Sequence, residues 1–205
     1  MKYLEFTDVE IHELKSEIIG ETFEILVKQP DPQLLSLFGN KPLPVVYGTD
    51  ANLSAGGYIN TLEGLLLGGE IPPVLFIGIR YKLGDEPDFM QFVTSRTREF
   101  TPTEDAENQK LMEQMTLREV KGGGAENFLK FLTTELRDWV SERFNVSDDT
   151  TYIGDSMGGL FGLYTLFTEP RAFKRYVIGS PWQEWNHPKT FELEESYAEN
   201  NNAVS

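Results

Sequence analysis

The sequence predicts an α/β fold in which a mostly parallel sheet is covered by helices. Three observations predict it. Residues 73–80 (PVLFIGIR) are nearly all apolar, which is typical of a parallel strand buried on both faces. Segments with strand composition alternate along the chain with segments that repeat apolar residues at helical spacing. Within residues 150–167, a short strand runs directly through a glycine-rich turn into a helix.

The first elements should form an antiparallel hairpin at one edge of the sheet. Residues 9–14 and 22–28 have strand composition, and Phe23, Ile25 and Val27 alternate with polar neighbours. His12 falls inside the first strand, so we expect a structural role for it rather than a catalytic one. Residues 29–44 contain four prolines and are interpreted as a connection.

A second strand-to-helix transition follows. Residues 43–47 (LPVVY) predict a compact strand, and the small residues of GTDAN, at 48–52, predict a sharp change of direction. A loop of this kind can expose a backbone N–H. A helix should then pass through Tyr58 and Leu62 and end at Gly68 and Gly69.

Residues 81–121 are polar and weakly periodic, so we expect them to wrap the surface rather than to build the sheet. Arg96 and Arg98 allow two interpretations. They can bind a substrate carboxylate in a forked geometry, or they can hold a loop through carboxylates or carbonyls, and we adopt the second. The three glycines at 122–124 lack the Lys-Ser/Thr of a phosphate loop and predict a hinge into an amphipathic helix over residues 125–144.

The motif GDSMGG, at residues 154–159, contains G-x-S-x-G between the strand at 150–153 and a helix. Gly154 and Gly158 lack the side chains that would collide at a sharp turn carrying Ser156. The N–H of Met157 would then lie at a helix N-terminus, where it can donate to a developing oxyanion. This context favours Ser156 as a catalytic nucleophile. The alternative is an ordinary glycine-rich turn in which Ser156 is a helix N-cap.

The end of the chain continues the alternation. Pro170 breaks the helix, residues 175–179 (RYVIG) predict another strand, and residues 190–205 predict a short acidic helix or a disordered tail.

Composition limits the classes of function. A length of 205 residues suits one domain, and 40% hydrophobic residues can fill a substantial core. The net charge of −15 argues against nucleic acid and anionic membranes as partners. No cysteine is present, which excludes disulfides and thiolate metal sites. The first ten residues do not suit a signal peptide, and no apolar run approaches the roughly 18 residues of a membrane span, so we expect a cytoplasmic protein.

With these pieces in order, the chain resembles the putative-esterase branch of the α/β-hydrolase superfamily, the group containing enterochelin and salmochelin esterases. The matching segments are the opening hairpin ending in ILVKQP, then VVYGTDAN, VLFIGIRY, RTREFTPT, GGGAENFLKFLTTEL, YIGDSMGGLFGLYTLF and FKRYVIGSPWQEW, and they cover most of residues 9–186. The resemblance implies an α/β-hydrolase three-layer sandwich with an N-terminal antiparallel hairpin, formed by residues 1–205 as a single, incomplete domain. It implies a small-molecule ester substrate, with neither a cofactor nor a metal.

The resemblance also implies roles for particular residues. Ser156 matches the nucleophile, and the N–H groups of Met157 and Ala51 match the oxyanion hole. The family commonly has glycine where Ala51 stands.

The chain departs from the family in its last part. In the superfamily an acid and then a histidine follow the serine, on loops after later strands. Here His187 is the one histidine after Ser156, and it follows the very next strand. We expect a surface histidine before Pro188, with a substitute base as the alternative, and we expect the last strands and the acid and histidine to be missing.

Two functions remain open on these grounds. The first is a serine carboxylic-ester hydrolase that is weakly active or inactive as this chain alone. The second is a non-catalytic binding or regulatory protein that keeps the esterase scaffold. Because residues 175–179 would form an open edge of the sheet, we also expect possible self-association there.

Overall fold

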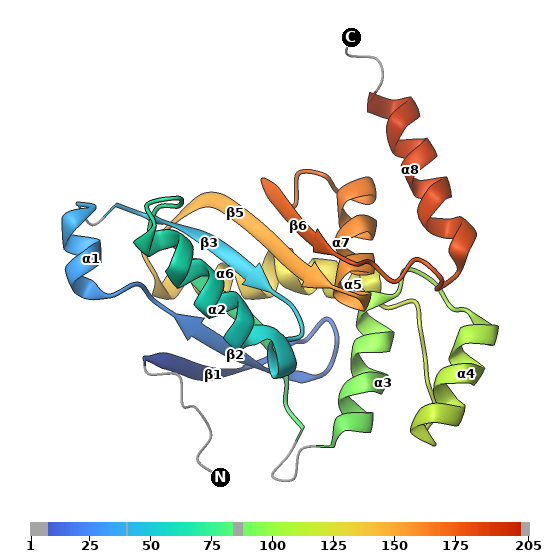
Figure 1. The fold of residues 1–205 in the computed structure, drawn as a ribbon. Helices are drawn as coiled ribbons and strands as arrows, with labels where there is room; N and C mark the ends of the chain where they lie inside the picture. The colour runs from blue at the N-terminus through green and yellow to red at the C-terminus, as the bar shows by residue number, and fades with distance from the viewer. Residues whose placement is uncertain (1–7, 40, 84–87, 202–205) are drawn as a thin grey trace.

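The structure is a computed structural model that describes residues 8–39, 41–83 and 88–201. Within them a six-stranded sheet runs in the order β1-β2-β4-β3-β5-β6 (Figure 1). Its strands are β1 (Val9–Lys15), β2 (Thr22–Lys28), β3 (Leu43–Gly48), β4 (Leu75–Tyr81), β5 (Val146–Asp155) and β6 (Arg175–Gly179).

The sheet is antiparallel at one edge and parallel through the rest. β1 pairs with β2, and β2 with β4, in antiparallel register. β4, β3, β5 and β6 pair in parallel, with Gly48 opposite both Gly78 and Ile153. The predicted hairpin and the mostly parallel sheet are therefore confirmed. Because parallel strands end at the same rim of a sheet, the residues that follow β3, β5 and β6 lie close together.

Helices cover both faces of the sheet, which gives three layers (Figure 1). α2 packs on one face, where its Tyr58 ring lies 6.2 Å from that of Phe76 of β4 and Ile59 belongs to the same buried cluster. The larger core lies on the opposite face, where Phe128 and Phe161 pack against Tyr152 and its neighbours. The helices are α1 (Pro32–Leu37), α2 (Ala51–Leu67), α3 (Phe89–Phe100), α4 (Ala106–Thr116), α5 (Ala125–Phe131), the π-helical η1 (Leu132–Leu136), α6 (Arg137–Arg143), α7 (Met157–Thr168) and α8 (His187–Asn201).

The helix predicted over residues 125–144 is present but contains the π-helical segment η1 in its middle. Its buried stripe includes Phe128, Leu132 and Leu136, as the periodicity predicts. Glu135 of η1 accepts hydrogen bonds from the hydroxyl of Ser16 at 2.6 Å and from the backbone N–H of Glu17 at 3.0 Å. These bonds tie the helix to the β1–β2 turn.

Two expectations need correction. Residues 29–44 were interpreted as a connection, yet they contain α1. Residues 88–121 add no strand to the sheet, as expected, but the expectation of a surface wrap did not include the helices α3 and α4. Aspartates at 31, 88 and 105 cap these helices. Such capping residues mark helix starts in a sequence even where the apolar residues show little helical periodicity. α3 also buries Phe92 and Phe100 at the C-terminal rim of the sheet, so it does more than cover a surface.

For the C-terminal segment the sequence left two alternatives, a short acidic helix or a disordered tail. α8 extends from His187 to Asn201, so residues 190–201 form the helix rather than the disordered tail, while 202–205 lie outside the described residues. None of the helices described here has the length and apolar character needed to cross a membrane.

Candidate active site

Ser156 is the single residue between the end of β5 and the start of α7. Its backbone has φ 57° and ψ −115°, a combination that is unfavourable for a residue with a side chain. The strand-turn-helix context predicted for Ser156 is confirmed. Ser156 occupies the N-cap position of α7, as the alternative interpretation has it, but its hydroxyl makes no capping hydrogen bond to the helix.

The turn requires glycine on both sides of the serine. A Cβ added to Gly154 would lie 2.4 Å from the hydroxyl oxygen of Tyr152 and 2.6 Å from the carbonyl oxygen of Gly158. A Cβ added to Gly158 would lie 2.6 Å from Oγ1 of Thr49. These distances are far below ordinary contact, so the two glycines are steric requirements of the turn.

The backbone of Ser156 is held by the neighbouring strand and its loop. Its N–H donates to the carbonyl of Gly179 at the end of β6, and its carbonyl accepts from the N–H groups of Leu160 and Trp182, each at 3.0 Å. Within the described ranges, the hydroxyl of Ser156 has no recorded hydrogen-bond partner. The main chain is thus fixed while the oxygen remains available for chemistry.

Two N–H donors lie at the first positions of their helices. Met157 begins α7 and Ala51 begins α2, and an N–H at this position has no acceptor inside its own helix. In the described parts of the chain neither N–H is bonded to another protein group. Thr49 and Asp50 lie against Gly158, because a Cβ there would come within 2.6 Å of Thr49 Oγ1 and 3.5 Å of Asp50 Oδ2.

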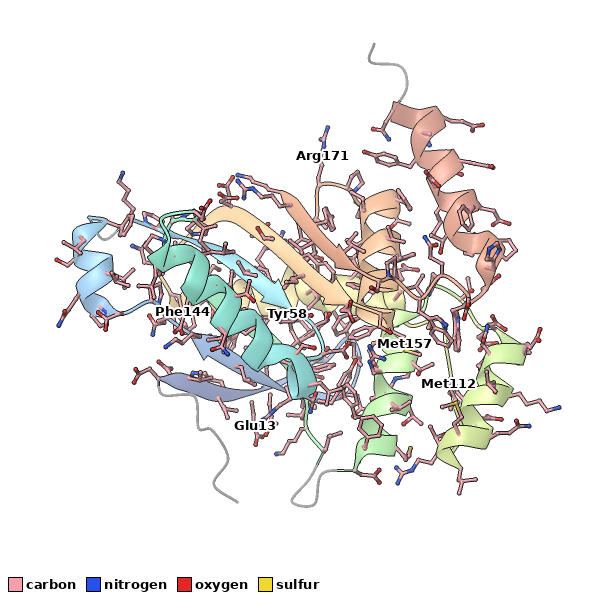
Figure 2. The ribbon with its side chains drawn as sticks, in the orientation of Figure 1. Glu13, Tyr58, Met112, Phe144, Met157 and Arg171 are labelled. Atoms are coloured by element: carbon pink, nitrogen blue, oxygen red, sulfur yellow. The ribbon has the colours of Figure 1, made fainter. Side chains whose placement is uncertain are left out.

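The two helix N-termini therefore lie together at the ends of β3 and β5, and Figure 2 shows Met157 where α7 meets α3. The positive ends of both helix dipoles lie there, and the first N–H group of each helix is unpaired. This arrangement suits a negatively charged oxygen beside Ser156. The structure thus brings Ser156, Met157 and the start of α2 to one rim, as the sequence predicts, although their chemical roles stay a prediction.

The buried side chain of Tyr152 connects the start of α7 with the residues just before α2. Its hydroxyl donates to the carbonyl of Gly158 at 2.6 Å and lies 3.1 Å from the hydroxyl of Thr49. Burial raises the pKa of Tyr152 well above its ordinary value, so the phenol stays protonated and able to donate. Sequence reasoning placed Tyr152 in a strand and missed this role, because the contact with Thr49 joins residues 103 positions apart.

The start of α2 is anchored by two further side chains, Arg96, for which a structural role was expected, and Asn52, which sequence reasoning did not assign. Arg96 of α3 binds the carboxylate of Asp50 through two hydrogen bonds, of 2.9 Å and 2.5 Å. The side-chain amide of Asn52 pairs with both backbone groups of Tyr81 at the end of β4. Burial raises the pKa of Asp50, and the guanidinium of Arg96 opposes that rise.

The arginine pair is structural, as expected. Arg98 binds Glu99 at 2.6 Å and Glu21 at 3.3 Å, while Arg96 binds Asp50. Both guanidinium groups are thus engaged by carboxylates of the protein. The expectation that these arginines hold the chain through carboxylates is confirmed.

Neither histidine contacts Ser156. His12 lies on β1, hydrogen-bonded to Glu10, with its ring 5.2 Å from Trp139. This is the structural role expected for it. His187 begins α8 as an exposed residue, and its ring lies 5.1 Å from Phe191. The prediction of a surface histidine is confirmed. Among the described residues, no cluster of three or more His, Asp or Glu side chains is arranged to hold a metal.

Comparison with known proteins gives one family. Residues 16–205 match the family described as "Putative esterase". Ferri-bacillibactin esterase BesA of Bacillus subtilis (strain 168) is 36% identical over 154 residues, which are 71% of this chain and 50% of that protein. Siderophore triacetylfusarinine C esterase of Aspergillus fumigatus is 29% identical over 175 residues, 82% of this chain and 53% of that protein. The chain spans about half the length of these curated relatives.

Solved structures share the architecture. The crystal structure of the BES protein from Bacillus cereus superposes with a TM-score of 0.77 at 25% identity, over 98% of this chain and 72% of that one. Siderophore hydrolase EstA from Aspergillus nidulans gives a TM-score of 0.74 at 23% identity, over 100% of this chain and 69% of that one. The expected α/β-hydrolase fold is therefore confirmed.

Proposed function

The chain belongs to the Putative esterase family, and from that premise we propose that it is a serine carboxylic-ester hydrolase whose nucleophile is Ser156. One observation carries the proposal. The hydroxyl of Ser156 is presented on a strained turn between two helix N-termini whose first N–H groups, on Met157 and Ala51, are unpaired.

In the proposed reaction, Oγ of Ser156 attacks the ester carbonyl carbon while a base accepts its proton. The carbonyl oxygen becomes an oxyanion that accepts hydrogen bonds from the N–H groups of Met157 and Ala51. Collapse of the tetrahedral intermediate breaks the C–O bond and releases the alcohol after protonation. Water then attacks the acyl-serine and releases the acid.

The proposed reaction needs a base that accepts the proton of Ser156. The described residues bring no histidine or carboxylate into hydrogen-bond contact with the Ser156 hydroxyl, and a neutral serine is a poor nucleophile. We therefore propose that this chain, tested alone, acylates slowly. The same observation favours the second candidate, a non-catalytic binding or regulatory protein that retains the scaffold.

The substrate class follows from the relatives. Two curated relatives are named as esterases of siderophores, one of ferri-bacillibactin and one of triacetylfusarinine C. We propose a small-molecule ester of the siderophore class as the substrate. The net charge of −15 makes nucleic acid and anionic membranes unfavourable partners.

A direct test is labelling of the serine by an activated ester. The chain is incubated with p-nitrophenyl acetate, release of p-nitrophenol is followed, and the acyl adduct is located by peptide mass spectrometry. The proposal expects an adduct on Ser156 and release that disappears in Ser156→Ala. Release that persists in Ser156→Ala would identify another nucleophile. An unlabelled Ser156 with no release above buffer would favour the binding protein.

A further inference from the structure

We propose that Asp155 is a specificity-determining residue of the site: its unpaired carboxylate, beside Ser156, favours esters that carry positive charge near the scissile bond over esters that carry negative charge there. This inference rests on the proposed function. It adds to that function the kind of substrate charge that the site accepts.

The position of Asp155 places its charge next to the nucleophile. Asp155 is the last residue of β5, and Ser156 follows it directly. Side chains alternate between the two faces of a strand, and Ile153 packs with α2, so Asp155 also lies on the face that carries α2. A Cβ added to Gly179 would lie 2.6 Å from Oδ1 of Asp155. Because the N–H of Ser156 donates to the carbonyl of the same Gly179, the carboxylate and the nucleophile both lie at the end of β6.

No neighbouring cation balances this carboxylate among the described residues. The side chain of Asp155 is exposed, and within the described ranges it has no recorded hydrogen bond or ion pair. By contrast, the buried carboxylates of Asp50 and Glu99 each bind an arginine of α3. A solvent-exposed carboxylate is ionised at neutral pH. Asp155 therefore contributes an uncompensated negative charge beside Ser156.

The field of Asp155 extends to the start of α2. Burial is the main cause of the raised pKa of Asp50, Arg96 opposes the rise, and the negative charge of Asp155 adds to it. Burial also raises the pKa of Tyr58 on α2, and the charges of Asp50 and Asp155 add to that rise. Asp50 precedes Ala51, whose N–H is a proposed donor to the oxyanion. The charge of Asp155 therefore acts at the proposed oxyanion hole as well as beside the nucleophile.

One further carboxylate lies on the loop that follows β6. Glu184 accepts a hydrogen bond from the indole N–H of Trp182 at 3.0 Å, and the backbone N–H of Trp182 donates to the carbonyl of Ser156. An indole donor carries no charge, so it does not neutralise Glu184. Glu184 is connected to Ser156 through Trp182, whereas Asp155 adjoins Ser156 in the chain. We therefore expect the same sign of effect from both carboxylates and the larger effect from Asp155.

A fixed charge of this kind acts on a charged substrate through Coulomb's law. Two unit charges about 7 Å apart in water-like surroundings change an equilibrium or a rate by about threefold. A positive group on the ester is attracted by that factor and a negative group is repelled by it. The developing oxyanion is repelled whatever the ester carries, so a comparison between esters separates charge preference from this common effect.

The test compares three p-nitrophenyl esters of phenylacetic acid, which carry a 4-methyl, a 4-carboxylate or a 4-trimethylammonium group. The rigid ring keeps the added group from reacting with the ester carbonyl. The kcat/KM of Ser156-dependent hydrolysis is measured for the protein and for Asp155→Asn. We expect the ratio of cationic to anionic ester to fall about tenfold in Asp155→Asn at low salt, and less than about twofold at 1 M salt. Asp155→Glu keeps the charge and should keep the ratio.

Two other variants serve as controls. Glu184→Gln should change the ratio less than Asp155→Asn does. Glu142→Gln removes the same charge from α6, where Glu142 is exposed beside Arg143, and should leave the ratio unchanged. The proposal is overturned if Asp155→Asn leaves the ratio unchanged, or if either control shifts it as much.

Fluorescence quenching separates this inference from the proposed function. Trp139 and Trp185 are buried, with 9% and 0% of their surface exposed. Of the three tryptophans, an ionic quencher therefore reaches mainly Trp182, whose backbone N–H bonds to Ser156. We expect iodide to quench Asp155→Asn about 1.5-fold more efficiently than the unaltered protein at low salt, with quenching by neutral acrylamide unchanged.

The two measurements fail separately. If no ester is hydrolysed in a Ser156-dependent manner, the proposed function fails, and quenching alone decides whether Asp155 governs the charge of molecules that approach Ser156. Equal iodide quenching of the two proteins would overturn the inference.

Discussion

At the scale of single residues, the turn at Ser156 depends on the absence of a Cβ at Gly154 and Gly158. Gly154 and Gly158 face each other closely enough that a Cβ on the first would reach the carbonyl of the second. The sequence motif predicts this requirement, because the spacing of the glycines is local. It does not predict Asp50 as the partner of Arg96, because that pair joins residues 46 positions apart and many carboxylates are available.

We predict that Gly154→Ala destabilises the protein by about 1–3 kcal/mol, the usual result of forcing extra atoms into a packed site. The added methyl would lie 2.4 Å from the Tyr152 hydroxyl and 2.6 Å from a backbone oxygen, which cannot move freely. The free energy of unfolding in urea measures the effect. Gly57→Ala in α2 is the control, because a Cβ there meets nothing within 4 Å. It should be neutral or stabilising by up to about 1 kcal/mol. Equal effects of the two substitutions would contradict the steric argument.

Glu99 gives a prediction about pH. Burial raises its pKa to about 7 from an ordinary value of 4.5, against the opposing charge of Arg98. Between these two pH values native Glu99 keeps a proton that the unfolded chain loses. The free energy of unfolding should therefore fall as pH rises from 4.5 to about 7, by about 1–3 kcal/mol from this group.

The measurement is urea unfolding across that range for the protein and for Glu99→Gln. Other carboxylates titrate in both proteins, so the difference between the two curves isolates Glu99. The exposed substitution Glu142→Gln is the control and should follow the unaltered protein. A difference between protein and Glu99→Gln that stays constant with pH would show that Glu99 does not hold its proton in the folded state.

At the scale of elements, the strands were predictable and several helices were not. Each of the four parallel strands carries a short apolar or β-branched run, and their order along the chain left few alternatives. α3 was missed because two of its four buried residues, Thr97 and Glu99, are polar, and α4 because it buries only Met112 and Thr116. Their Asp88 and Asp105 caps were the stronger signal. The π-helical segment η1 had no local signal in the sequence.

β6 leads to a prediction about association. Among the described strands it pairs only with β5, so its outer backbone groups form an open edge, and Val177 on it is 51% exposed. An open edge with apolar side chains offers unpaired backbone groups on which another chain can pair. We expect concentration-dependent self-association in light scattering, and a shift toward monomer for Val177→Lys. The exposed apolar residue Leu53 lies on α2, away from this edge, and Leu53→Lys should leave association unchanged. A protein that stays monomeric at all concentrations would contradict the role of the edge.

At the scale of the whole molecule, the high negative charge acts against that edge. A net charge of −15 makes two copies repel each other, and the repulsion is screened over about 10 Å at 0.1 M salt. Association through an apolar edge should thus strengthen with salt, whereas association through ion pairs would weaken. The salt dependence tells which contact holds the copies together.

The whole molecule also determines how fast the proposed chemistry runs. Its fold brings a serine, two N–H donors and two helix dipoles to one rim, but the two histidines lie on β1 and at the start of α8. Loss of the base in a well-studied serine hydrolase costs about 10⁶-fold in turnover, while an oxyanion hole and binding alone retain about 10³ to 10⁴ over water. We therefore predict slow turnover of p-nitrophenyl acetate by this chain.

The rate should be unchanged in His187→Ala, because the ring of His187 lies against Phe191 and not against Ser156. Steady-state release of p-nitrophenol measures both proteins, with Ser156→Ala giving the background. Turnover of several per second that His187→Ala removes would identify His187 as the base. In that case the start of α8 would have to move toward Ser156 during the reaction, and the geometry described here would be a resting state.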